Sequence, residues 1–370
     1  MNDVDVFNPT RLTWARRRRG MTKTRLAAGV GVELRSISAY ETGEFNPEPD
    51  RFAAIARTLK FPADFFFGDD IEEPAIDTAS FRSLSKMTAR QRDTALGSGA
   101  IAMLLNEWIE ASFELPEPDL PDLGRDANPE SAAAAIRQAW GLGELPIKNM
   151  VHLLEAKGVR VYSLAIDAAE VDAFSMWRRN RPFVFLNTLK SAEHGRFDAA
   201  HELGHLVLHR HAAPNGQEAE QDANAFASAL LMPSASVRAH APRFATIDIL
   251  MRLKKVWGVS LAAMTYRLHK LGLLSEWHYR TLYIEISSRG YRKKEPAGGP
   301  REISQVLQKV FSALRAEGVS KEEIAEKLRV HPTDIDELVF GLAFTSLDGV
   351  PRRNDRGRSR PALTLISSKD

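Results

Sequence analysis

Apolar residues recur at helical spacing through the first 68 residues of the chain, interrupted by short polar or glycine-containing turns. Caps and breaks in this pattern predict four short helices, at about Pro9–Arg19, from Thr22 as an N-cap, at Glu33–Thr42 and from Asp50 onward. The second and third helices are separated only by a turn at Gly29-Val30-Gly31. Two short helices joined by such a turn are the helix-turn-helix arrangement, so we expect a compact all-helical unit at 7–68.

Two proline-bearing breaks follow this unit. An acidic stretch at 68–75 has the composition of a linker, and a long helical pattern runs from Thr88 to Phe113 behind it. The proline-rich stretch at 114–129 is the clearest domain boundary in the chain. We therefore expect residues 69–129 to form a linker that contains one long helix.

Residues 130–290 alternate between helical and strand-like runs. Helices are expected near 130–140 and 146–157, and strands near 158–162, 171–175 and 183–186. A small sheet therefore comes directly before a long helix at about 197–209. Residues 301–348 are expected to form a C-terminal helical unit, and the arginine-rich residues 349–370 a flexible basic tail. The pattern as a whole predicts a mainly α fold with a small β-sheet (α+β).

Composition narrows the chemistry that the chain can perform. Of its 370 residues, 44% are hydrophobic and 26% are charged, which is typical of a protein with globular cores. There is no cysteine, and this excludes disulfides, cysteine-ligated zinc and thiol catalysis. The first twenty residues lack an apolar signal segment, and no apolar stretch approaches the length of a membrane span. We expect a cytoplasmic protein without a membrane contact.

Positive charge is concentrated at the start of the chain, although the net charge is only +2. Residues 9–25 hold seven basic residues and no acidic one, which is the kind of patch that attracts phosphates. Within the helix-turn-helix unit, Leu34, Arg35 and Ser38 are the candidates for contacts with base edges, and Arg35 is the best of them. The candidates for phosphate contacts are Arg16, Arg17, Arg18, Arg19, Lys23 and Arg25. The alternative is that this unit binds a protein or dimerises.

The segment His201-Glu202-Leu203-Gly204-His205 has the spacing of a catalytic zinc motif. On a helix, residues four apart share a face, so the imidazoles of His201 and His205 can converge on one ion. Glu202 can then serve as general base toward a water that the metal activates. The alternative is a surface helix whose histidines bind no metal.

A catalytic zinc needs a third protein ligand and an open fourth position. The candidates are acidic residues and histidines that follow the motif: His209, His211, Glu218, Glu220 and Asp222. His209 lies one helical turn too far along to share an ion with His201. We expect Glu220 to be the ligand, from a second helix at about 218–232. Glu218 and Asp222 stay open as alternatives, because acidic residues at a helix N-terminus also favour the helix dipole.

The run from Arg196 to His209, together with the run from Glu220 to Pro233, resembles the ImmA/IrrE family of bacterial and phage metallopeptidases. The similarity extends from about Ala135 to Tyr283. It implies a zincin-like metallopeptidase domain at 130–290. It also implies a zinc ion held by His201, His205 and Glu220, with Glu202 as the catalytic residue. Asp198 stands where a hydroxyl residue is common in the family, which puts substrate contacts in doubt rather than the chemistry.

Residues 10–67 resemble the XRE class of helix-turn-helix domains, notably in Tyr40-Glu41-Thr42-Gly43 and Pro47. A glutamine common at the start of the second helix is Lys23 here, so one DNA contact is expected to differ. The stretch from Ser320 to Ile335 also has helix-turn-helix spacing. Its first helix is acidic, which favours packing or partner docking over a contact with nucleic acid.

These observations together predict a DNA-binding transcription regulator that is also a zinc-dependent endopeptidase. The resemblance implies that its substrate is a protein, a helix-turn-helix repressor whose cleavage would derepress genes. The expected partners are double-stranded DNA and this substrate, and a homodimer is compatible with the sequence. One alternative is a regulator whose peptidase-like domain senses or docks a partner without turnover. Another is self-cleavage in the proline-rich stretch at 114–129.

Overall fold

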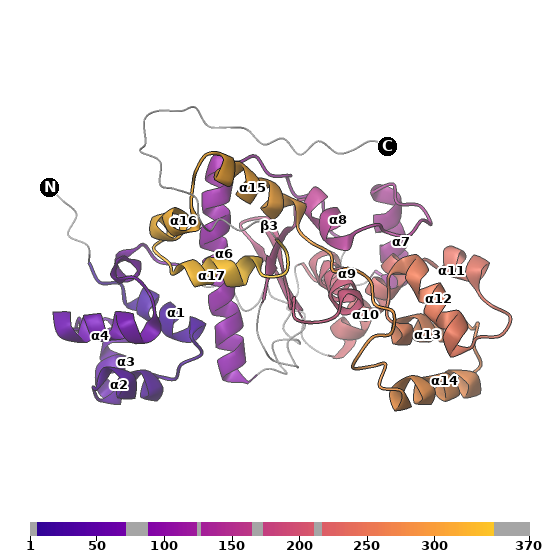
Figure 1. Cartoon of the computed structure of the whole chain (residues 1–370), viewed down its shortest axis with the longest axis horizontal. Helices are drawn as coiled ribbons and strands as arrows, with labels where there is room; N and C mark the ends of the chain where they lie inside the picture. The colour runs from indigo at the N-terminus through magenta and orange to yellow at the C-terminus, as the bar shows by residue number, and fades with distance from the viewer. Residues whose placement is uncertain (1–5, 72–87, 124–126, 165–172, 211–216, 344–370) are drawn as a thin grey trace.

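The computed structural model describes residues 6–71, 88–123, 127–164, 173–210 and 217–343, and they form a mostly helical molecule with one three-stranded mixed sheet (Figure 1). This confirms the expected α+β fold. No helix in the described ranges is long and apolar enough to cross a lipid bilayer. The expected basic tail, 349–370, lies outside these ranges.

The N-terminal unit contains four helices and a short 3-10 helix. Their bounds are α1 (Pro9–Arg18), α2 (Lys23–Val30), α3 (Leu34–Thr42), α4 (Pro49–Leu59) and η1 (Ala63–Phe67). Thr22 caps α2, because its hydroxyl accepts the backbone N–H of Arg25. Gly31 ends α2 in the left-handed conformation, with φ of 73°. Gly29 and Val30 therefore belong to α2, and the turn of the helix-turn-helix begins only at Gly31.

The long helix α6 (Ala89–Ser112) joins this unit to the sheet. It begins with a capping box between Thr88 and Gln91, as the sequence predicts for a helix from Thr88 to Phe113. Gly97 lets α6 cross α1 closely, since a Cβ there would lie 2.7 Å from the Cα of Arg18. Gly99 lies against the sheet, where a Cβ would be 3.7 Å from the rings of Phe174 and Phe185. α6 thus packs both on the N-terminal unit and on the sheet.

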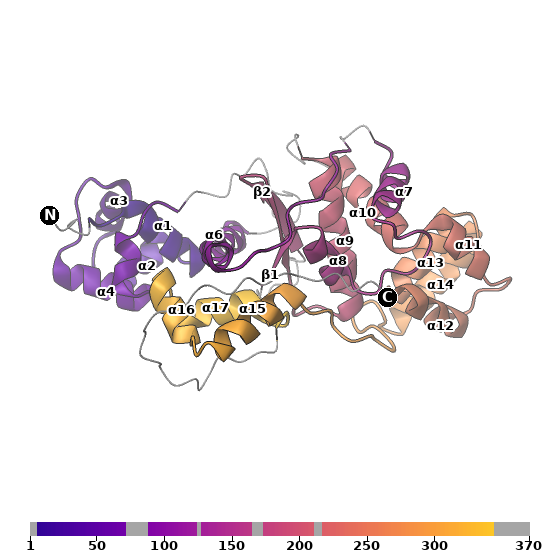
Figure 2. The ribbon, with the colours of Figure 1, turned by 90° about the horizontal axis from the view of Figure 1, so that it is seen from above.

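The sheet has the strand order β1-β3-β2. Its strands are β1 (Arg160–Ser163), β2 (Ala173–Arg178) and β3 (Arg181–Leu186). β1 pairs parallel to β3, and β2 pairs antiparallel to β3 through a two-residue turn in which Arg179 and Asn180 have positive φ. β2 runs three residues beyond the expected end of its strand, and positions 171 and 172 lie outside the described residues. Figure 2 shows α6 on one side of the strands and α9 on the other.

Among the described residues between 129 and 288, eight helices lie in the central and right-hand parts of the molecule in Figure 1. They are α7 (Pro129–Ala139), α8 (Met150–Ala156), α9 (Ala192–Leu208), α10 (Gln217–Leu231), α11 (Ser234–His240), α12 (Ile247–Trp257), α13 (Leu261–Lys270) and α14 (Glu276–Ser288). The helix expected from 146 begins only at Met150, because Asn149 caps it. α9 begins five residues before the expected 197, after Ser191 as its N-cap.

The proline-rich stretch packs on this central part of the molecule. Leu120 is only 8% exposed, and the backbone N–H of Leu123 donates to the carbonyl of Val207 in α9. Gly158 is in contact with the stretch, since a Cβ there would lie 2.4 Å from the backbone of Glu117. The described part of this stretch, 114–123, therefore packs on the molecule through Leu120 and Leu123, although Glu117 and Asp119 within it are exposed. Cleavage there would first require these contacts to open.

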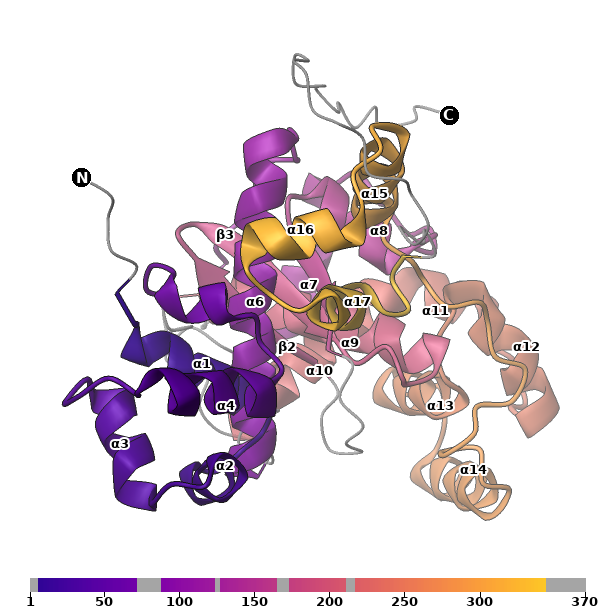
Figure 3. The same cartoon turned by 60° about the vertical axis from the view of Figure 1, so that its left-hand side comes forward.

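The C-terminal helices return to the middle of the molecule. They are α15 (Gln305–Ala316), α16 (Lys321–Leu328) and α17 (Pro332–Val339), and Figure 3 shows them between the N-terminal unit and the central helices. α17 packs on α6 and β1, with Ile335 and Leu338 buried. The helix that would read DNA in this second helix-turn-helix pattern is therefore used for packing, in agreement with the expected docking role.

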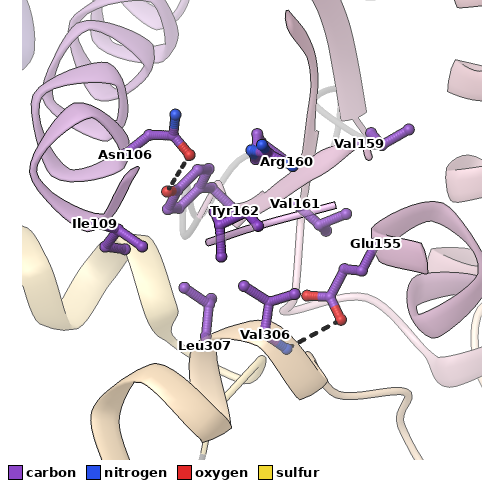
Figure 4. A pocket seen from close by; sticks show the side chains of 10 residues that line it. Asn106, Ile109, Glu155, Val159, Arg160, Val161, Tyr162, Val306 and Leu307 are labelled. Atoms are coloured by element: carbon purple, nitrogen blue, oxygen red, sulfur yellow. Dashed lines mark hydrogen bonds between the residues drawn. The ribbon is translucent and has the colours of Figure 1, made fainter. Parts of the chain in front are cut away.

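A buried carboxylate holds the start of α15. Glu155, at the end of α8, accepts hydrogen bonds from the hydroxyl of Ser304 and from the backbone N–H groups of Gln305 and Val306. Figure 4 shows the last of these bonds. A cavity of about 10 Å³ lies beside it between α6, β1 and α15, which is the space of about one water molecule. It is too small for a peptide and is lined by none of the residues of the zinc motif, so it is no substrate site.

Candidate metal centre and helix-turn-helix surface

The zinc motif lies on α9 where α10 crosses it. Gly204 permits the close crossing, since a Cβ there would lie 3.0 Å from the ring of Phe226 and 3.3 Å from the Cα of Ala223. The other end of α10 is fixed by buried arginines. Arg137 of α7 donates to the carbonyl of Leu230, and Arg267 of α13 donates to that of Met232 just beyond the helix. These contacts together hold α10 in one position relative to α9.

The crossing brings three potential ligand atoms together. The Nε2 atoms of His201 and His205 lie 3.1 Å apart, and the two carboxylate oxygens of Glu220 lie 3.7 and 3.3 Å from them, respectively. Ligands at 2.0–2.1 Å from a tetrahedral ion are separated from each other by roughly 3.3 Å. The three side chains therefore form one face of a tetrahedron around a point that a metal ion fits.

The outer ring nitrogens of both histidines have partners. Nδ1 of His201 lies 3.1 Å from Oδ1 of Asn224, and Nδ1 of His205 lies 3.1 Å from Nδ1 of His209. Burial lowers the pKa of His205 to about 3, with a smaller contribution from His209, and so favours the neutral ring that a metal requires. His209 thus contacts a ligand and is not itself in the cluster, as its distance along the helix predicts.

The alternative third ligands are placed elsewhere. Glu218 is exposed at the start of α10. Asp222 is half-buried near His209, and desolvation raises the pKa of its carboxyl, although His209 partly opposes this shift. Neither belongs to the cluster that can hold a metal within the described residues, whereas Glu220 does. His211 lies outside the described residues.

The carboxylate of Glu202 is held from the sheet. The hydroxyl of Ser175 on β2 donates to its Oε2 at 2.6 Å, and both residues are 2% exposed. Sequence reasoning missed Ser175, because it lies 27 positions away and only the fold brings it to α9. Asp198, the departure from the family pattern, is 8% exposed and lies 3.6 Å from His194.

The helix-turn-helix unit presents part of the expected DNA surface. Leu34 is 47% exposed and Arg35 is exposed at the start of α3, whereas Ser38 is half-buried. Arg25 is exposed on α2. Lys23 lies 3.3 Å from Glu41, so its ammonium already has one carboxylate partner.

Most of the arginine run faces inward instead. Arg16 pairs with Glu41, and Arg18 and Arg19 pair with Asp334 of α17, which is fully buried. Because these guanidinium groups are engaged with carboxylates of the chain, the expectation that they contact phosphate is wrong. Arg17 is more exposed, lies over the ring of Trp14 and is 4.0 Å from Asp93.

Comparison with known proteins agrees with both units. Residues 12–66 match the helix-turn-helix family, and residues 154–269 match the M78 peptidase family of IrrE N-terminal-like domains. No curated protein matches the chain significantly. The second match runs from the end of α8 to the end of α13 and so includes the His201, His205 and Glu220 cluster. The chain therefore combines a DNA-binding helix-turn-helix domain with a metallopeptidase-like domain of the M78 family.

Proposed function

We propose that this protein is a DNA-binding transcription regulator with zinc-dependent endopeptidase activity, and that it cleaves a helix-turn-helix repressor to derepress genes. The observation that carries the proposal is the triangle of ligand atoms from His201, His205 and Glu220, next in sequence to the buried carboxylate of Glu202. Two imidazoles, one carboxylate and an open fourth position form a ligand set of catalytic zinc.

Each residue of the site has a distinct task in peptide hydrolysis. When bound, zinc lowers the pKa of a water to about 7 and polarises the scissile carbonyl. Glu202 accepts the proton of the attacking water and delivers it to the leaving amine. Ser175 keeps the Glu202 carboxylate in one orientation through the hydrogen bond at 2.6 Å.

The helix-turn-helix domain supports a substrate that is itself bound to DNA. A protease tethered to the same promoter region meets its substrate at a raised local concentration, without any new contact between the two proteins. A repressor bound at a neighbouring operator would be such a substrate. The intact ligand set favours turnover over a purely sensory role for the M78 domain.

Incubation of the zinc-loaded full-length protein with the helix-turn-helix repressor encoded beside it tests the proposal. The wild type should produce repressor fragments, and Glu202→Gln should abolish them while zinc stays bound. Glu218→Gln is the matched control, because Glu218 is an exposed carboxylate near the start of α10. Undiminished cleavage by Glu202→Gln would remove Glu202 from the mechanism, and an intact repressor with the wild type would favour the sensory role.

A further inference from the structure

The DNA-facing end of the molecule has fewer cations than the sequence suggests. Arg16, Arg18 and Arg19 are engaged with carboxylates, and Lys23 is shared with Glu41. Phosphate contacts supply most of the affinity of a helix-turn-helix protein for DNA. A further source of positive charge near α2 would therefore strengthen binding considerably.

The first turn of α6 brings such a charge to the helix-turn-helix domain. Gly20, in the loop between α1 and α2, has φ of 56°, and a Cβ there would lie 3.0 Å from Nε of Arg90 and 2.8 Å from the hydroxyl of Thr94. Arg90 is exposed to solvent. Asp93, an acidic residue of this part of α6, lies 4.0 Å from Arg17.

The position of Gly20 places Arg90 at the phosphate-binding end of the domain. Thr22, two residues further on, caps α2, and Lys23 and Arg25 lie in the first turn of that helix. In helix-turn-helix proteins the first helix of the motif crosses the DNA backbone, and side chains and N–H groups near it hold phosphates. An arginine beside this loop can reach the same strand, because its flexible side chain carries a permanent charge.

We propose that Arg90 is a DNA-phosphate contact that lies outside the helix-turn-helix domain. The inference rests on the DNA-binding half of the proposed function. α6 also packs on the sheet behind the metal centre, so this contact joins bound DNA directly to the body of the peptidase domain (Figures 1 and 2). The protein would then contact DNA through both the helix-turn-helix domain and α6, which packs on that domain.

A salt titration of DNA binding tests the proposal with the full-length protein. The probe is a labelled 30-base-pair duplex of mixed sequence, because a phosphate contact does not depend on sequence. Arg90→Ala should weaken binding several-fold at about 0.1 M salt, and the slope of log K against log salt concentration should become shallower by about 0.9. Arg90→Lys should restore most of the slope, since it keeps the charge.

Arg243→Ala is the matched control, because Arg243 is exposed and lies between α11 and α12, far along the chain from the helix-turn-helix domain. It should leave both affinity and slope unchanged, and Arg25→Ala should lower both. If Arg90→Ala matches the wild type while Arg25→Ala is weakened, the proposal is overturned. If the wild type itself does not bind the duplex, the DNA-binding half of the proposed function fails instead, and the cleavage assay is unaffected.

Discussion

The two motif histidines differ in the partner that each has at its outer ring nitrogen. His201 faces an amide oxygen of Asn224, whereas His205 faces the ring of His209. With a metal at Nε2, the proton of His205 must lie on Nδ1, and Nδ1 of His209 must accept it. Asp222 lies close enough to His209 to counteract the lowering of its pKa by burial. His209 and Asp222, two of the residues considered as third ligands, therefore support the ligand His205 instead.

Replacing His209 should weaken metal binding without removing a ligand. In His209→Ala the ring of His205 loses the acceptor that fixes its tautomer and orientation, so zinc affinity should fall by about 10- to 100-fold. Competition with a fluorescent zinc chelator measures this change. His194→Ala is the control on the same helix, because His194 is half-exposed and lies at the far end of α9. Equal affinities in His209→Ala and the wild type would show that His209 only fills space.

The sequence predicted the metal ligands better than the residues that orient the side chains of the site. The spacing of His201 and His205 defines one face of a helix, and this is enough to predict that both point to one ion. Glu220 follows from the family resemblance, whereas spacing alone left Glu218 and Asp222 open. Ser175 could not be predicted, since its contact with Glu202 depends on how a strand lies against α9.

At the level of elements, Glu155 links α8 to α15. Desolvation raises the pKa of its carboxyl from 4.5 to about 7, although Ser304, Gln305 and Val306 donate hydrogen bonds that oppose the shift. A folded pKa above the unfolded value means that the folded protein keeps a proton that the unfolded chain releases between about pH 4.5 and 7. The contribution of Glu155 to the free energy of unfolding should therefore decrease as pH rises through this window.

Urea unfolding at pH 5, 6, 7 and 8 checks this dependence. Relative to Glu155→Gln, which does not titrate, the wild type should lose stability as pH rises from 5 to 7 and then level off. Glu317→Gln removes an exposed carboxylate at the other end of α15 and should follow the wild type at every pH. A constant difference between the wild type and Glu155→Gln across the range would mean that the carboxyl is ionised throughout.

Helix boundaries were predicted where a cap or a glycine marks them, as at Thr22, Gly43 and Thr88. They were missed where tertiary contacts decide. The strand β2 extends to Arg178 because it pairs with β3 along its whole length. The proline-rich stretch has the composition of a linker, yet Leu120 is buried against the central part of the molecule, which local sequence does not reveal.

At the level of the whole molecule, α17 ties the helix-turn-helix domain to the rest of the chain. Asp334 is fully buried and accepts both Nη1 and Nη2 of Arg19, at 2.6 and 2.8 Å, with Arg18 at 3.4 Å. The sequence predicts a phosphate-binding surface at Arg18 and Arg19, because their shared acidic partner lies more than 300 positions away in sequence. The C-terminal helices return to α1, and only this packing shows that Arg18 and Arg19 pair with Asp334.

Removing Asp334 should loosen this connection. In Asp334→Ala the guanidinium group of Arg19 keeps its burial without its carboxylate partner, which costs about 3–5 kcal/mol. The C-terminal helices should then be cut much faster in limited proteolysis than in the wild type. Asp336→Ala is the control, because Asp336 is 52% exposed and pairs with Lys321 at the surface. Equal cleavage rates in Asp334→Ala and Asp336→Ala would show that other contacts hold the unit.

The central claim is that His201, His205 and Glu220 hold one hydrolytic metal ion. Its most direct test is the zinc content of the purified chain after dialysis against zinc and a competing chelator. The account predicts one zinc per chain for the wild type and for the control Glu218→Ala. For Glu220→Ala it predicts a loss of affinity greater than the roughly 10- to 100-fold that an outer partner contributes. If Glu220→Ala keeps one zinc as tightly as the wild type, the proposed metal centre is contradicted.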